Sequence, residues 1–323
     1  MMHLEARRLE YAFGTGILTL PSPFESDMRP FCHLLFSLLL VAFRHLPARA
    51  QAPLGAVWDS VATMLRAPGV STGGYFRYTL SRRDITLRIG DVTVAPALAL
   101  GSWAGFSGDP LDATVMGDLV LTAAELKPVL AELAMQQLEV TAVHNHLVGE
   151  TPPLTYVHFH GQGAATAVAA GLDKVLARTA TPRPVAPAPA APPTIDTALV
   201  FRTLGKSGTA RGSVAQVGFM LVPGVVTMRG RTVVPAMGYG SPVNVQLVSG
   251  SRAVATGDFA VTGDKVTGIL AALAAHGVAA TAVHTHLIDE SPHLYYIHFW
   301  ADGPLPDVLE AIRAALDAAR APG

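Results

Sequence analysis

The sequence has little cysteine and little charge. Among 323 residues there is one cysteine, Cys32, and charged residues make up 15% of the chain with a formal net charge of −1. A chain without a basic face or an acidic tail lacks the electrostatic signature of a nucleic-acid-binding protein, so we expect no nucleic-acid partner. Because Cys32 lies in an N-terminal apolar segment, the rest of the chain offers no disulfide, cysteine nucleophile or thiolate metal site.

The chain also lacks a hydrophobic run long enough to anchor it stably in a membrane. The apolar stretch at residues 31–43 follows Arg29 and precedes Ala48-Arg49-Ala50. A basic start, about a dozen apolar residues and an A-x-A site are typical of a secretory signal peptide, since a spanning helix needs about 20 residues. We therefore expect a signal peptide at residues 28–50, a non-native upstream extension at residues 1–27, and an exported protein of the periplasm or the cell exterior.

One block of sequence is written twice. His144-Asn145-His146 recurs 140 positions later as His284-Thr285-His286, and the following glutamate and histidine keep the same offset. The chain is therefore read as a tandem duplication, with repeat 1 at residues 51–179 and repeat 2 at residues 195–321. Residues 180–194 between them are rich in proline and alanine, which predicts an extended, semi-stiff linker.

Each repeat shows the same order of short strands and longer helices. Alternating apolar runs with turn signals predict strands at residues 75–80, 85–89 and 92–94, and a capping box formed by Thr122 and Glu125 opens a predicted helix at 123–135. The histidine pair is placed on a predicted strand at 140–147, beside a second strand at 154–160. The predicted fold class is α+β, with a mainly antiparallel sheet and flanking helices in each repeat, packed as a pseudo-two-fold body.

The duplicated block carries residues that bind metals. On a strand, residues i and i+2 face the same side, so the two histidines of each pair converge, and the next strand brings a third histidine beside them. Three imidazoles and a carboxylate suit a divalent transition metal, either zinc, manganese, iron or copper. The predicted metal ligands are His144, His146, Glu150, His158, His284, His286, Glu290 and His298.

Two further residue sets were weighed against this one. His160 is left out because repeat 2 has Trp300 at that position. Asp118 and Asp258 recur in both repeats and are read as turn residues that would also be able to face the histidines. A metal-free reading is that the histidines form a cross-strand network with hydrogen bonds to the backbone and to Glu150.

The sequence around these residues resembles a known family. The pattern Gly-Asp-Leu-Val-Leu-Thr-x-x-Glu-Leu, followed by Val-Thr-Ala-Val-His-Asn-His-Leu-x-x-Glu-Thr-Pro, is similar to the LppY/LpqO-type family of exported bacterial proteins over residues 55–320. The resemblance implies export and a duplicated domain of unknown function. Members named as lipoproteins carry a lipid-anchoring cysteine, which this chain lacks at the predicted cleavage site.

Three functions are open at this point. The first is an exported protein that binds a transition metal. The second is a metal-dependent hydrolase or oxygen-using enzyme in which Glu150 or Glu290 is the general base. The third is a metal-free module for a sugar-like or aromatic small molecule, whose cleft is lined by Trp103, Tyr156, Tyr239 and Tyr296.

Overall fold

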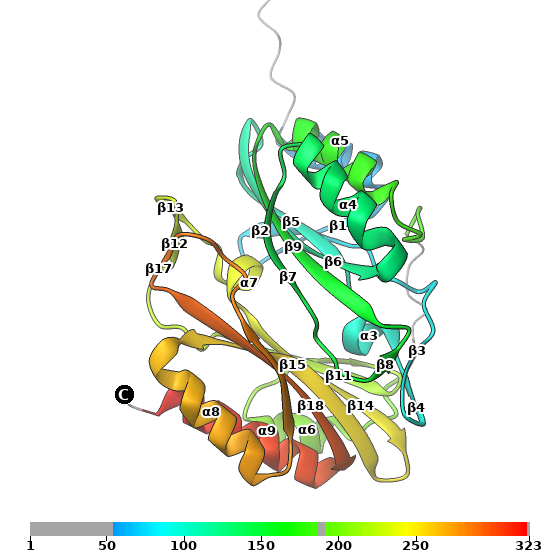
Figure 1. Ribbon diagram of the computed structural model, residues 1–323, viewed down its shortest axis with the longest axis vertical. Helices are drawn as coiled ribbons and strands as arrows, with labels where there is room; N and C mark the ends of the chain where they lie inside the picture. Colours follow the sequence, from blue (N-terminus) through cyan, green and yellow to red (C-terminus); the bar gives the residue numbers. More distant parts are fainter. Residues whose placement is uncertain (1–53, 186–190, 322–323) are drawn as a thin grey trace, which may run out of the picture. The chain divides into compact units, whose positions relative to one another are not determined.

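The computed structural model describes residues 54–185 and 191–321 (Figure 1). The predicted upstream extension and signal peptide lie outside these residues. None of the described helices is long and apolar enough to cross a membrane.

Repeat 1 forms a six-stranded antiparallel sheet in the order β1-β2-β5-β6-β9-β7 and a small sheet in the order β4-β3-β8. Its elements are α2 (Leu54–Leu65), β1 (Gly69–Thr72), β2 (Tyr75–Thr79), β3 (Leu87–Ile89), β4 (Val92–Val94), α3 (Pro96–Ala99), β5 (Trp103–Asp109), β6 (Asp112–Thr122), α4 (Ala123–Met135), β7 (Glu139–His144), β8 (Glu150–Thr151), β9 (Leu154–Gly163) and α5 (Ala165–Leu176).

Repeat 2 has the same topology, with sheets in the orders β10-β11-β14-β15-β18-β16 and β13-β12-β17. Its elements are α6 (Thr197–Leu204), β10 (Thr209–Arg211), β11 (Val214–Phe219), β12 (Thr227–Met228), β13 (Arg231–Thr232), α7 (Pro235–Gly238), β14 (Ser241–Ser249), β15 (Arg252–Thr262), α8 (Gly263–Ala275), β16 (Ala279–His284), β17 (Glu290–Ser291), β18 (Leu294–Pro304) and α9 (Leu305–Arg320). The predicted duplicated α+β fold is confirmed.

Each large sheet has a helix-covered face and an inner face. In repeat 1, α2, α4 and α5 pack on the outer face, where alternate strand residues such as Leu119, Val157 and Phe159 enter the main hydrophobic core. In repeat 2, α8 and α9 cover the corresponding face with Phe259 and Phe299 beneath them (Figure 1). Because side chains alternate along a strand, the residues between these positions must point to the inner face.

The helix starts follow the local sequence. The capping box predicted at Thr122 is present, since the backbone N–H of Thr122 donates to Glu125 Oε2 at 2.8 Å. Glu125 also binds Arg82, which is 1% exposed and donates to both carboxylate oxygens. This buried pair ties the start of α4 to the loop after β2.

The inner faces of the two repeats pack against each other. The small sheet of each repeat shares a hydrophobic cluster with the large sheet of the other: Leu87 and Val92 pack with Val254, and Met228 and Val233 pack with Met116. Polar contacts extend the interface. The Gln246 side chain accepts from the backbone N–H of Ala95 at 2.8 Å and donates to the Thr93 carbonyl at 2.9 Å.

The ends of the predicted linker are held against the repeats. The backbone N–H of Val185 donates to the Arg66 carbonyl at 2.8 Å, and Arg183 pairs with Asp173 of α5. At the other end, the N–H of Thr194 donates to the Gly212 carbonyl at 2.8 Å. The described parts of the linker therefore run along the surface of the repeats that they connect.

Candidate functional site

The alternation of β9 and β18 places a tyrosine and a histidine of each repeat on the inner face. Val157 and Phe159 enter the core under the helices, so Tyr156 and His158 face the other way. Tyr296 and His298 do the same on β18. The neighbouring strands add a carboxylate, because Asp118 stands opposite His158 and Asp258 opposite His298 in the ladder.

The first histidine of each pair ends its strand. A register irregularity between Val140 and Ala142 brings Ala142 opposite His158 and His144 opposite Tyr156. The predicted strand at 140–147 therefore extends too far, since β7 ends at His144. The chain leaves the ladder where the Asn145 side chain donates to the Leu154 carbonyl at 2.8 Å. A side chain thus replaces the next backbone pair, and His146 follows in a turn.

All six predicted histidines meet in one cluster between the repeats. The Nε2 atoms of His144 and His298, which belong to different repeats, are 3.1 Å apart. The rings of His144 and His284 stack with centroids 3.9 Å apart, and those of His158 and His286 with centroids 3.7 Å apart. The duplication therefore builds a single composite cluster.

Two overlapping groups in this cluster have ring nitrogens close enough to share one ion, all within 4.8 Å of one another. One group is His144, His284, His286 and His298, and the other is His144, His146 and His158. His144 belongs to both. The first group draws on both repeats, which reading each motif by itself does not anticipate.

The cluster is largely buried, and burial favours the neutral imidazole of five of its residues: His144, His146, His158, His284 and His286. Burial, with a smaller contribution from neighbouring histidines, lowers the pKa of His146, His158 and His286 well below the ordinary value. The same causes lower the pKa of His284 to about 4. A neutral imidazole keeps a lone pair on one ring nitrogen, which is the form that binds metals.

Several ligand atoms in the cluster make no hydrogen bond. They are Nδ1 of His144, Nε2 of His146, Nε2 of His158 and Nδ1 of His284, together with Oδ1 of Asp118. Buried polar atoms are nearly always paired in proteins, because leaving one unpaired costs about 1–3 kcal/mol. Such a concentration of unpaired ring nitrogens and carboxylate oxygen is typical of a site that binds a ligand.

Asp118 and Asp258 face the histidines. Oδ1 of Asp118 is 3.9 Å from Nε2 of His158. Oδ1 of Asp258 is 2.6 Å from Nδ1 of His298, and the same ring nitrogen is 3.1 Å from the Gly257 carbonyl oxygen. Burial, followed by the charge of Asp258, raises the pKa of Asp118 well above its ordinary value, against a lowering by Arg77. Asp118 is therefore suited to holding a proton beside the cluster.

Glu150 and Glu290 begin the short strands β8 and β17, which follow the histidine pairs. Oε1 of Glu150 accepts from the backbone N–H of Leu154 at 3.3 Å, and Oε1 of Glu290 accepts from Leu294 at 2.9 Å. Among the residues described by the structure, neither glutamate belongs to the two histidine groups. These hydrogen bonds stabilise the turns that lead into β9 and β18. A role of Glu150 or Glu290 as metal ligand or general base stays a prediction.

The four aromatic residues proposed for a cleft have different surroundings. Tyr156 and Tyr296 are buried and stack on His146 and His286, and their hydroxyls donate to backbone carbonyls at 2.9 and 2.8 Å. Tyr239 is buried in the cluster of apolar residues at the repeat interface. Trp103 and Tyr156 line a cavity between the two large sheets.

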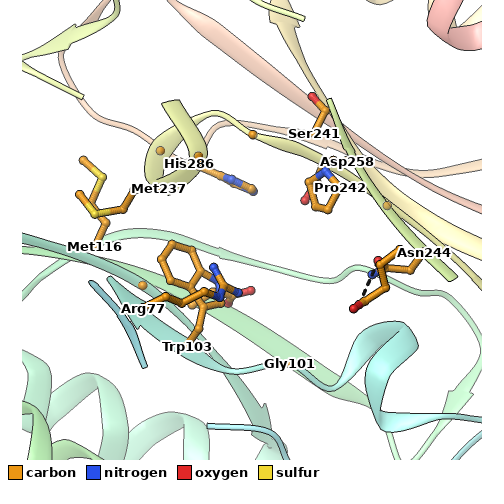
Figure 2. A pocket seen from close by; sticks show the side chains of 18 of the residues that line it. Arg77, Gly101, Trp103, Met116, Met237, Ser241, Pro242, Asn244, Asp258 and His286 are labelled. Atoms are coloured by element: carbon orange, nitrogen blue, oxygen red, sulfur yellow. Dashed lines mark hydrogen bonds between the residues drawn. The ribbon is translucent and has the colours of Figure 1, made fainter. Parts of the chain in front are cut away.

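This cavity has a volume of about 630 Å³ and is lined by residues of both repeats, including His146, His158 and His286. Figure 2 shows His286 on its wall. Arg77 and Trp103 stand on the wall formed by repeat 1, across from Ser241, Pro242 and other residues of repeat 2. Sequence reasoning did not single out Arg77. The signal that would have found it is a difference between the repeats, since repeat 2 carries Gln216 at the position of Arg77.

Comparisons with known proteins give one family and two distant structures. No curated protein matches the chain. EtuB from Clostridium kluyveri is similar at 10% identity over 79% of this chain and 90% of that chain, with a TM-score of 0.20. The trimeric bacterial microcompartment shell protein PduB is similar at 12% identity over 79% of this chain and 91% of that chain, also with a TM-score of 0.20. Likenesses at this level carry no argument about this protein.

The family match agrees with the duplication seen in the structure. The model of a family described as Domain of Unknown Function (DUF1259) matches twice, over residues 59–178 and again over residues 198–318. Each match covers most of one repeat, with its large sheet, its small sheet and one set of three histidines. The chain therefore belongs to this family, with two copies of its domain.

Proposed function

We propose that this protein binds a divalent transition metal in the histidine cluster shared by its two repeats. The observation that carries the proposal is the group of His144, His284, His286 and His298, whose ring nitrogens converge within 4.8 Å. Burial lowers the pKa of His144 and His284, so both rings are neutral and able to bind a metal at pH 7.

The donor set favours zinc, copper or iron over manganese among the four metals predicted from the sequence. Both histidine groups supply nitrogen only, and imidazole suits zinc, copper and iron better than it suits manganese, which prefers oxygen ligands. Four nitrogens from two repeats match the closed coordination of a site that carries or stores a metal. Because His144 is common to both groups, one ion per chain is the expected stoichiometry.

Elemental analysis tests the proposal. Protein purified without added metal is analysed directly, and metal-stripped protein is then titrated with zinc and with copper. His144→Ala is expected to lower the affinity at least tenfold, since it removes a ligand from both groups. His160→Ala is the matched control, because His160 is a buried histidine of the same strand β9 as His158 and is outside both groups. Equal metal affinity of His144→Ala and the unchanged protein would contradict the proposal.

A metal-dependent enzyme is the second candidate function, favoured by the cavity that reaches the cluster. The group of His144, His146 and His158 has three nitrogens, which leaves a coordination position open for water or substrate. Asp118 lines the same cavity and its raised pKa suits a general acid. If the protein is an enzyme, Asp118→Asn should keep the metal and lose turnover, whereas Glu150→Gln should keep both if Glu150 only holds the turn.

We also propose that the protein is exported and is of the LppY/LpqO type. Support for this comes from the predicted signal peptide at residues 28–50 and from the sequence pattern of the duplicated block. Cell fractionation with an antibody against repeat 2 tests it. Recovery of a chain cleaved after Ala50 in the periplasm or the medium is expected, and an uncleaved chain in the cytoplasm would contradict export.

A further inference from the structure

The cavity between the sheets differs at its two ends, although the fold around it is duplicated. The ladder gives the correspondence: Arg77 pairs with Gly105, which pairs with Met116, and Gln216 pairs with Asn244, which pairs with Thr256. Arg77 in repeat 1 therefore stands where Gln216 stands in repeat 2. By the same register, Trp103 corresponds to Pro242.

The repeat 2 end of this correspondence is closed by hydrogen bonds. Gln216 donates to the Ala97 carbonyl at 2.9 Å, and Asn244 donates to the Leu98 carbonyl at 2.8 Å. These amides fasten the short helix α3 of repeat 1 onto the sheet of repeat 2. Their donors are used within the protein, so this end has a structural role.

The repeat 1 end is built differently. Arg77 is partly buried, lies with its Cζ 4.3 Å from the centroid of the Trp103 ring, and donates to the Tyr75 hydroxyl at 3.3 Å. Among the ion pairs of the described residues, none involves Arg77. Stacking on Trp103 fixes the plane of the guanidinium, while most of its N–H donors have no acceptor among the described residues.

We propose that the cavity binds a small organic carboxylate, whose carboxylate group pairs with the guanidinium of Arg77 and whose apolar body packs against Tyr75, Met116 and Met237. An arginine fork held in one plane matches a carboxylate with two parallel hydrogen bonds. The Tyr75 ring and the two methionines line the same cavity, and Figure 2 shows Met116 and Met237 close together on its wall. Its volume of about 630 Å³ suits a small molecule.

The charges on the cavity wall select among anions. Arg77 is the arginine in the lining, and Asp118 and Asp258 line the cavity as well. A monocarboxylate has one charge for one guanidinium. Inorganic phosphate carries more charge than one guanidinium compensates, and it has no apolar body to pack against the apolar part of the wall.

Calorimetric titration of the full chain tests the inference, with benzoate as the carboxylate and benzyl alcohol as its uncharged counterpart. Benzoate is expected to bind at least tenfold more tightly than benzyl alcohol and than inorganic phosphate. Arg77→Gln, which introduces the residue of repeat 2, should weaken benzoate at least tenfold and remove the preference over benzyl alcohol. Arg88→Gln is the control, because it removes an exposed arginine of β3 that bonds Thr93 and the Asp91 carbonyl.

The inference is overturned if benzoate does not bind, if Arg77→Gln binds it as tightly as the unchanged protein, or if phosphate binds equally well. If Arg77→Gln does not fold, the comparison of benzoate with benzyl alcohol on the unchanged protein still decides. Titrations are run on metal-stripped and on zinc-loaded protein. Benzoate binding to the stripped protein that depends on Arg77 supports the carboxylate site even if the metal proposal fails. Metal binding without benzoate binding supports the metal proposal and overturns the carboxylate site.

Discussion

Acid is expected to destabilise the metal-free protein through the histidine cluster. Burial lowers the pKa of five of the six histidines below the ordinary value: His144, His146, His158, His284 and His286. The unfolded chain takes up protons on these rings below a pH of about 6.5, while the folded chain does not. The stability that these neutral histidines contribute is therefore fully present above that pH, and it is lost as the pH falls toward their pKa values in the folded chain.

The size of the effect follows from His284. Its pKa falls from 6.5 in the unfolded chain to about 4 in the folded chain. Linkage then gives a loss of about 2 kcal/mol of unfolding free energy between pH 7 and pH 5 from this one residue. Since a folded domain has a total stability of about 5–15 kcal/mol, even one such residue has a measurable effect.

Urea denaturation of metal-stripped protein, followed by circular dichroism at pH 7 and pH 5, measures this loss. His284→Asn should reduce the difference between the two pH values by about 2 kcal/mol, because its share of the proton uptake is gone. His276→Asn is the control, since His276 is exposed at the end of α8 and outside the cluster. Equal unfolding free energies at the two pH values would refute the reasoning about a buried neutral cluster.

Further predictions concern the metal, a buried ion pair and the repeat interface. Zinc at 100 times its dissociation constant should raise the unfolding free energy by about 2.7 kcal/mol, measured by urea denaturation with and without chelator. Arg82→Met should cost about 3–5 kcal/mol because it leaves Glu125 buried without its partner. Arg313→Ala should cost less than about 1 kcal/mol, because both side chains of the Arg313–Asp317 pair are exposed. Gln246→Ala should cost about 2 kcal/mol, since it leaves backbone groups of repeat 1 without their partners. Melting curves of each variant check these values.

The pseudo-symmetry of the protein has a functional consequence. Its duplicated part, the three histidines and one aspartate of each repeat, meets at the centre, where both copies serve one cluster. The part that differs, Arg77 and Trp103 against Gln216 and Pro242, lies on the cavity wall. Duplication therefore builds the shared histidine cluster, and divergence of the repeats makes the two ends of the cavity different.

The sequence by itself determined much of the fold and which residue types form the cluster. Local signals are sufficient for this: the capping box at Thr122 predicted the helix Ala123–Met135 with the bounds that the structure shows. The constant offset between the repeats identified the histidines as a set. Short-range periodicity and caps depend on neighbours in the chain, so they can be read without the tertiary structure.

Only the tertiary structure decided how the histidines are shared. A ligand group that joins His144 with three histidines of repeat 2 depends on how two inner faces pack, and contacts between residues 140 or more positions apart leave no periodic signal. The same holds for the placement of Glu150, whose carboxylate accepts a backbone hydrogen bond inside its own turn. Strand alternation tells which side chains share a face, and the packing of the two faces decides which of them meet.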